Sequence, residues 1–402
     1  MMAKDIVDRR YRIWLLLLLL LALGLSAWIY ELTYGLATTG MRGVISWGLY
    51  ICTFVFLVKL SAGGLIVASS AEVFDITALR PLAKLGALTA AVCISLAGLT
   101  LIPDLGRPAR ILNLLLHPNW RSPMIWDAFI VGVYFGLAVS ELRLMSNPTT
   151  ANQRRLRIMA FVGLPAAFAL HSITAWIFGL QVSHIFWNTA LMAPLFVVSA
   201  ILSGTALITI IVAALRSTVN LDIAPTTWRK LGGLIAISLA LDLFFVFSEY
   251  LTVLWAGVPD EVATLRMVLP GGEFAILFWL EWVLGGIIPF LLLVLPRTRA
   301  NVKSIIISAA LVLVGVYSFQ LELIPVGMAN PLIQLAPGNS LGTYDSGVSV
   351  FQFRGQYTPT WVEYLIILGL FALGAILLML GYRYIVSEAE AKGPAAEKAA
   401  EA

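Results

Sequence analysis

Residues 12–34 read RIWLLLLLLLALGLSAWIYELTY, and this apolar stretch sets the scale for the whole chain. A helix of about 20 apolar residues crosses the hydrocarbon core of a bilayer. The sequence of 402 residues is 60% hydrophobic and only 12% charged. Water-soluble domains carry about 25% charged residues, so this chain lacks the charge to cover a solvated surface. We therefore expect an all-α integral membrane protein.

Further apolar stretches of the same length follow, separated by short polar connections. They cover residues 43–71, 82–103, 124–145, 156–180, 188–215, 228–255, 273–296, 302–324 and 360–385. The stretch at 12–34 follows basic residues, as a signal peptide does, but its apolar run is long and Ser26-Ala27-Trp28 offers no small-x-small cleavage site. The sequence thus predicts about ten transmembrane helices, the first of them retained.

Lysine and arginine gather in alternate connections, which indicates the orientation of the chain. One side receives the N-terminus and the basic residues within 80–84, 143–157, 216–230, 297–303 and 383–398. The other side holds Arg42, Arg107, Arg110, Arg121, Arg266 and Arg354. Because basic connections stay in the cytoplasm, we expect a multi-pass protein of the inner (plasma) membrane with both termini cytoplasmic, and we expect the second group of connections on the outer side.

The composition excludes several kinds of site. The chain has 3 histidines, His117, His171 and His184, and only His171 falls inside an apolar stretch. Two b-type haems held by paired histidines would need four. Cys52 and Cys93 lie in apolar stretches without a CxxC motif, and the net charge of +4 is too small for nucleic-acid binding. We expect no haem and no metal bound by this chain, and no nucleic-acid partner.

The outer connection between the third and fourth stretches carries a recognisable pattern. Residues 103–110 read PDLGRPAR, and residues 117–127 read HPNWRSPMIWD. These segments resemble the polysulfide reductase membrane subunit (NrfD/PsrC) family, for which the D-L-G-R-P and N-W-R-S-P segments are typical. The glycine-rich residues 60–65, LSAGGL, and the number of apolar stretches resemble the longer, ten-helix members of that family.

The resemblance implies two four-helix bundles flanked by the first and last helices. The corresponding segments are 1–42, with a cytoplasmic start and the first helix; 43–180, the first bundle with the DLGRP loop; 181–324, the second bundle; 325–359, an outer loop; and 360–402, the last helix with a cytoplasmic tail. The loop at 325–359 is longer than topology requires, so we expect it to be a lid or docking loop.

The resemblance also implies a role in a respiratory oxidoreductase complex. Members of the family exchange electrons between the membrane pool of menaquinone, or another quinone, and a ferredoxin-like iron–sulfur subunit docked on them. That subunit passes the electrons to a molybdopterin catalytic subunit or to a multihaem cytochrome. The membrane subunit contributes quinone binding, and the terminal reaction belongs to another protein of the complex.

The outer connection contains three arginines, Arg107, Arg110 and Arg121. Their expected position on the outer side is an exception to the rule that basic residues stay on the cytoplasmic side. A guanidinium group presents a planar fork of donors that suits carboxylates at an interface. Asp104 is close enough in sequence to orient one of them. We expect these residues to dock the partner, while an equally open alternative is that they only tie the loop to its own helix ends.

Quinol oxidation needs an apolar slot, a polar group at the quinone oxygen and a proton acceptor. His171 lies about 13 Å below the outer end of its helix by helical rise, and Asp127 begins the neighbouring helix. With Trp47 and Tyr50, they are expected to line one pocket under the Arg107 loop, where His171 and Asp127 accept protons. The alternatives are a histidine bonded to a nearby carbonyl and an aspartate that serves only the helix dipole.

Several ionisable residues lie within apolar stretches and predict a proton route, because charge at membrane depth is costly. Lys59 is in the second stretch, Glu281 is in the eighth, and Asp242 and Glu249 share one face of the seventh. The alternative is that they lock helices together through polar pairs. We expect Glu249, Glu322 and Glu363 near the outer surface, within reach of water.

Three other functions remain open from the sequence. The chain could be a proton-translocating subunit, as in alternative complex III, or a passive membrane anchor without a quinone site. It could also be a solute transporter, which would predict broken helices at symmetrical positions of two inverted halves.

Overall fold

A computed structural model describes residues 2–75, 80–146, 149–219, 224–329 and 355–386. These residues form helices and connections without any strand, and ten helices are long and apolar enough to cross a membrane. The spans are Tyr11–Tyr34, Leu49–Ser70, Leu82–Asp104, Pro123–Ser146, Thr150–Gly179, Met192–Arg216, Pro225–Ala256, Ala275–Val294, Val302–Val326 and Trp361–Val386. The predicted fold class, an all-α integral membrane protein with ten spans, is confirmed.

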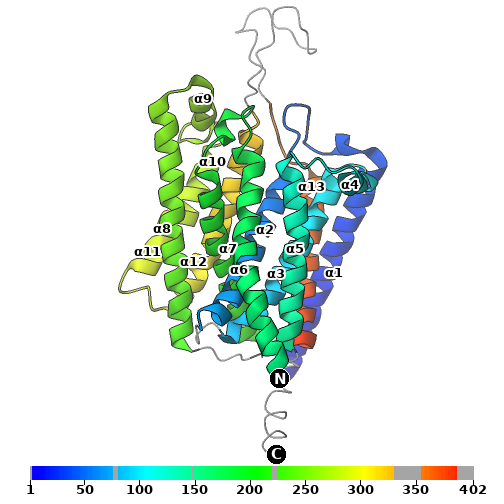
Figure 1. Cartoon of the computed structure of the whole chain (residues 1–402), viewed down its shortest axis with the longest axis vertical. Helices are drawn as coiled ribbons and strands as arrows, with labels where there is room; N and C mark the ends of the chain where they lie inside the picture. Colours follow the sequence, from blue (N-terminus) through cyan, green and yellow to red (C-terminus); the bar gives the residue numbers. More distant parts are fainter. Residues whose placement is uncertain (1, 76–79, 147–148, 220–223, 330–354, 387–402) are drawn as a thin grey trace, which may run out of the picture.

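The spans run side by side and gather into two groups of four (Figure 1). The first group consists of α2 (Leu49–Val73), α3 (Arg80–Asp104), α5 (Pro123–Ser146) and α6 (Thr150–Gly179). The second group consists of α7 (Met192–Val219), α8 (Pro225–Ala256), α12 (Val302–Leu321) and one composite helix. The composite helix is formed by α10 (Ala275–Phe278), η4 (Trp279–Ile287) and α11 (Ile288–Val294) in succession. The helices α1 (Met2–Tyr34) and α13 (Trp361–Gly381) pack against each other at the outer edge, and α13 also packs against α3. The division of the chain into domains stays an interpretation.

The α2 helix lies at the centre, in contact with both groups, and 89% of its most apolar stretch is buried. Glycines let the groups approach each other closely. A Cβ atom added at Gly63 of α2 would lie 2.2 Å from the Cα atom of Gly204 of α7. Small residues at this crossing therefore bring the backbones of two bundles together, as is common between membrane helices.

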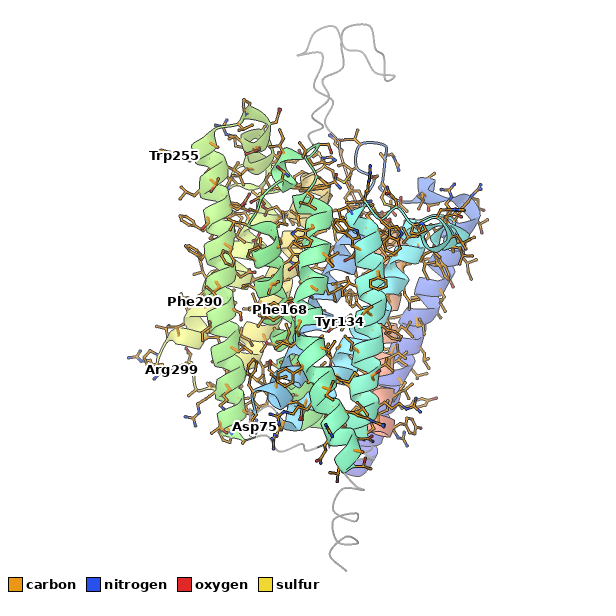
Figure 2. All side chains as sticks on the ribbon, viewed as in Figure 1. Asp75, Tyr134, Phe168, Trp255, Phe290 and Arg299 are labelled. Atoms are coloured by element: carbon orange, nitrogen blue, oxygen red, sulfur yellow. The ribbon has the colours of Figure 1, made fainter. Side chains whose placement is uncertain are left out.

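The two ends of the helical body differ. The loop end, at the top of Figure 1, carries the connections 35–48, 105–122, 180–191 and 257–274, with the short helices α4 (Ile111–Leu116) and α9 (Pro259–Val268). At the terminal end, α1 begins and η6 (Tyr382–Val386) ends. Figure 2 shows Trp255 close to the loop end and Arg299 near the terminal end. This is the placement expected for an interfacial tryptophan and for a connection rich in arginine.

Some helix boundaries differ from those predicted. The second span begins at Leu49 rather than at residue 43, and α6 begins at Thr150 rather than at 156 because the Thr149 side chain caps it by accepting from the Asn152 amide. The connection 257–274 contains α9, which the sequence pattern did not predict. Much of the expected lid or docking loop, residues 330–354, lies outside the described residues, as does the tail 387–402.

Three spans contain wider, π-helical turns: η6 ends the last span, and two others each carry an acidic residue. The latter two are η4, which contains Glu281, and η5 (Glu322–Val326), which extends α12. A proline is near each of them, Pro289 just after η4 and Pro325 within η5. Proline removes a backbone donor and clashes with the carbonyl four residues earlier, and a wider turn relieves that clash. Both segments present a carboxyl group inside the membrane-spanning body.

Candidate functional site

One face of α6 carries a buried histidine with a free acceptor. His171 is 1% exposed, and its Nδ1 lies 2.9 Å from the Ala167 carbonyl oxygen. Because a carbonyl only accepts, the proton belongs on Nδ1, which leaves the lone pair on Nε2. Within the part of the chain that the structure describes, Nε2 has no close hydrogen-bond partner, and the Val58 backbone of α2 interacts with the same imidazole. The predicted alternative, a bond to a neighbouring carbonyl, therefore satisfies one ring nitrogen and leaves the other available.

A carboxyl group lies one turn further along the same face. Thr174 of α6 donates from Oγ1 to Oδ1 of Asp127 of α5, at 2.5 Å, and Asp127 is 4% exposed. Asp127 is not in the first turn of α5, and its carboxyl group bonds across to α6. The helix-dipole alternative therefore does not describe this residue, since that effect is confined to the first turn.

An aromatic cluster closes this face at the loop end. The rings of Trp47 and Trp187 are stacked with centroids 5.9 Å apart, and Phe178 of α6 stands edge-on to both. Phe178 lies seven residues beyond His171, on the same helix face. His184 lies against Trp187 with ring centroids 4.4 Å apart, and burial lowers the pKa of His184 from its ordinary value, which favours the neutral imidazole.

Three of the four predicted pocket residues thus lie along one face of α6, namely Trp47, Asp127 and His171. The sequence reasoning missed Phe178, Thr174 and Trp187. Spacing of three and seven residues from His171 was the available signal for Thr174 and Phe178, whereas nothing local places Trp187 there. The Nε1 atom of Trp187 donates to the Leu323 carbonyl at 2.6 Å, which fixes its ring against the second group of helices.

Tyr50 belongs to a different group of side chains. Its hydroxyl donates to Glu31 of α1, so it does not join the pocket with His171 as predicted. Nearby, the Tyr357 hydroxyl donates to Glu363 of α13 at 2.5 Å and accepts from the Leu49 amide at 2.6 Å. Glu363 also accepts from the Gly40 amide at 2.7 Å. The connection after α1 and the start of α2 are thereby tied to α13.

Asp104 turns inward, toward Glu31 and Glu363, with which it interacts electrostatically. We call Glu31, Asp104 and Glu363 the carboxyl cluster. The expected contact between Asp104 and an arginine is absent from the described ranges, and the guanidinium groups of Arg107, Arg110 and Arg121 form no ion pair there. All three arginines are exposed at the loop end, and no bond to a helix end is seen for them among the residues described, so the tie-down alternative gains no support.

The predicted proton-route residues form one network. Lys59 of α2 is fully buried, and its Nζ donates to the Ser199 hydroxyl of α7 at 3.3 Å and lies 4.1 Å over the Phe196 ring. Asp242 of α8 is hydrogen-bonded to the same Ser199. Lys59 also interacts electrostatically with Glu281. A hydroxyl therefore bridges the buried cation and the carboxyl group, as the helix-locking alternative predicts.

The network continues toward the loop end through Glu322. The carboxyl groups of Glu281 and Glu322 interact with each other, and the Tyr250 hydroxyl donates to Glu322. Glu249 accepts from Thr189 at 2.9 Å, beside a cavity of about 30 Å³ that Tyr250 and Glu322 also line. Such a volume holds about one water molecule.

The expected exposure of two carboxyl groups was wrong. Glu322 is 1% exposed and Glu363 is fully buried, although both lie near the loop end. The π-helical turn of η5 directs Glu322 inward, and the connection 35–48 covers Glu363. In the described residues, no group of three His, Cys, Asp or Glu side chains is arranged to hold a metal ion.

Comparison with known proteins matches the family description "Polysulphide reductase, NrfD" to residues 37–331. The chain belongs to the NrfD family. It is 38% identical over 397 residues to a putative dimethyl sulfoxide reductase membrane subunit of Halobacterium salinarum, covering 92% of this chain and 90% of that protein. It is 25% identical to the Hdr-like menaquinol oxidoreductase integral membrane subunit of Archaeoglobus fulgidus, with 92% of each protein covered. It is 27% identical to one of the polysulfide reductase chains of Wolinella succinogenes, over 70% of this chain and 94% of that one.

Proposed function

We propose that this chain is the quinone-binding membrane subunit of a respiratory oxidoreductase complex. It exchanges electrons between menaquinone, or a related quinone, and an iron–sulfur partner docked at the loop end. The NrfD relatives support membership of such a complex, since one is named a menaquinol oxidoreductase subunit and others are named subunits of reductases. We further propose that the loop end faces the outside of the plasma membrane and that both termini are cytoplasmic.

The observation that carries the proposal is that Nε2 of His171 has no close hydrogen-bond partner within the described residues, on the face shared with Asp127 and Trp47. A quinol that is oxidised releases two protons and two electrons. Nε2 can accept a hydrogen bond and then a proton from one hydroxyl, and Asp127 is a second acceptor one turn away. The aromatic cluster offers apolar faces for the ring system, as ligand pockets generally do. The electrons leave through the iron–sulfur partner.

The docking proposal depends on the exposed arginines. Arg107, Arg110 and Arg121 present three positive charges at the loop end. Such groups attract an acidic surface and pair with its carboxylates. We propose a ferredoxin-like iron–sulfur subunit as this partner, with a molybdopterin catalytic subunit or a multihaem cytochrome behind it.

The test uses His171→Ala in the assembled complex. We expect quinol-dependent turnover to be lost while the complex still assembles and the catalytic subunit still works with an artificial electron donor. His117→Ala is the matched control, because it removes an exposed imidazole near the same end. Normal menaquinol oxidation in His171→Ala would remove this residue from the mechanism and favour a passive anchor.

The polar network supports a second candidate function, proton transfer coupled to turnover. Lys59, Ser199 and Asp242 are joined by hydrogen bonds, and Glu281 and Glu322 extend the chain of groups toward Glu249. In sealed vesicles, we expect Asp242→Asn to lower the number of protons moved per electron pair, whereas Asp260→Asn, an acid of α9 at the loop end, leaves it unchanged. An unchanged stoichiometry in Asp242→Asn would exclude Asp242 from any route.

A further inference from the structure

A narrow slot lies between α1, α3 and α13, on the side of the first bundle away from α6. Its volume is about 160 Å³, and its wall is apolar, with Leu25 and Trp28 from α1, Leu99 and Pro103 from α3, and Leu373 from α13. Leu25 and Leu99 are 49% and 37% exposed. The slot therefore opens on the surface that faces the bilayer, where an apolar chain can enter from the side.

The carboxyl cluster stands at the loop-end head of this slot. Glu31 follows Trp28 by one helical turn on α1, and Asp104 follows Pro103 on α3. Three buried polar atoms gather here without a hydrogen-bond partner among the residues that the structure describes: Nε1 of Trp28, Oε1 of Glu31 and Oδ1 of Asp104. Glu31 is only 1% exposed. Buried polar atoms are nearly always paired, so a donor and two acceptors left open together favour the binding of a polar group at this point.

The open atoms restrict what that ligand can be. The indole donor requires an acceptor on the ligand, and the two carboxyl oxygens require donors. Three carboxyl groups disfavour the phosphate of a phospholipid, because they share its sign of charge. A metal ion lacks a suitable set of ligands in the described ranges. A neutral head group with phenolic hydroxyls, which donate and accept, satisfies all three atoms, and an isoprenoid tail suits the apolar slot.

We infer that the slot between α1, α3 and α13 is a second, lateral quinol-binding site. The hydroxyl groups of the quinol meet Glu31, Asp104 and Trp28, and the tail lies in the slot. This inference depends on the proposed function, since it takes the same substrate. The two sites involve different helices and different levels of α2: Tyr50 bonds to Glu31 of α1, while His171 of α6 interacts with the α2 backbone at Val58, eight residues further along.

The test is photolabelling of the whole complex in lipid nanodiscs with an azidoquinone, followed by mass spectrometry of the peptides. We expect label on peptides of α1 and α3 that include residues 21–31 and 99–104, competed by excess menaquinol. Ile102→Trp fills the slot, and Glu31→Gln weakens the acceptor while leaving an oxygen for Tyr50. Each should lower this label at least tenfold, whereas Ile158→Trp, on an exposed face of α6, should not.

The outcomes separate the inference from the proposed function. Competed label only on α5 and α6, lost in His171→Ala, would overturn the lateral site and keep the proposed function. No competed label on any helix, together with normal turnover in His171→Ala, would overturn both. Slot label that menaquinol does not displace and phospholipid does would show a structural lipid and overturn the inference.

Discussion

The bond between Thr174 and Asp127 provides a quantitative test of the site. Thr174→Val keeps the shape of the side chain and removes the hydroxyl that donates to Asp127 at 2.5 Å. Interhelical hydrogen bonds in membrane proteins average about 0.6 kcal/mol, with a maximum near 1.7 kcal/mol. Leaving a buried acceptor without a partner costs about 1–3 kcal/mol. Asp127 is 4% exposed, so the second effect dominates, and we expect a loss of about 2 kcal/mol in the free energy of unfolding.

The measurement is a double-mutant cycle that combines Thr174→Val with Asp127→Ala. The free energy of unfolding of each variant is measured by reversible unfolding in mixed detergent micelles. Thr209→Val is the matched control. Thr209 is fully buried and donates to the Thr205 carbonyl of its own helix at 2.8 Å, while the Thr174 hydroxyl has one hydrogen to share between Asp127 and the Leu170 carbonyl, which lies 2.9 Å away. The difference between the two variants thus isolates the contact with Asp127. If Thr174→Val costs no more than Thr209→Val, or if the cycle shows no coupling, the reasoning is refuted.

Two further predictions concern packing and docking. Gly63→Ala should lower the midpoint of thermal unfolding by several degrees, since the new Cβ would lie 2.2 Å from the Gly204 Cα and force α2 and α7 apart. Gly98→Ala, with open space around its Cβ, should have little effect, and equal midpoints would contradict the packing argument. Arg107→Glu should weaken binding of the iron–sulfur partner, most strongly at low salt, as measured by co-purification and titration. Arg266→Glu, at the same end, is the control, and unchanged binding in Arg107→Glu would place the partner elsewhere.

The spans were predictable because each one alone satisfies the length and polarity that a bilayer demands. Helix ends were less predictable, since Thr149 extends α6 by a local cap that hydropathy does not register. The short helix α9 is only weakly apolar and lies outside the spans, so no membrane constraint marks it. The wider turns at η4 and η5 lie beside or contain prolines in closely packed helices, and a helical repeat does not reveal such turns.

The site was predictable in part. His171 and Asp127 stood out because ionisable groups are rare at membrane depth. Tyr50 was assigned to the wrong neighbours, because a helical repeat gives the face of a residue but not the helix opposite it. Glu31 lay within the first apolar stretch and carried the same signal as His171, yet its partner Tyr50 emerges only once α1 packs beside α2 and α13. Burial of Glu322 likewise follows from the π-helical turn that contains it rather than from its position in the sequence.

The central claim is that His171 receives the quinone head group near the loop end. Its most direct test is a structure of the intact complex with bound menaquinone or a competitive inhibitor. We predict the head group within hydrogen-bond distance of His171 Nε2, below the rings of Trp47 and Phe178. A head group bound only at the terminal end, near Arg80 and Arg154, would contradict the account.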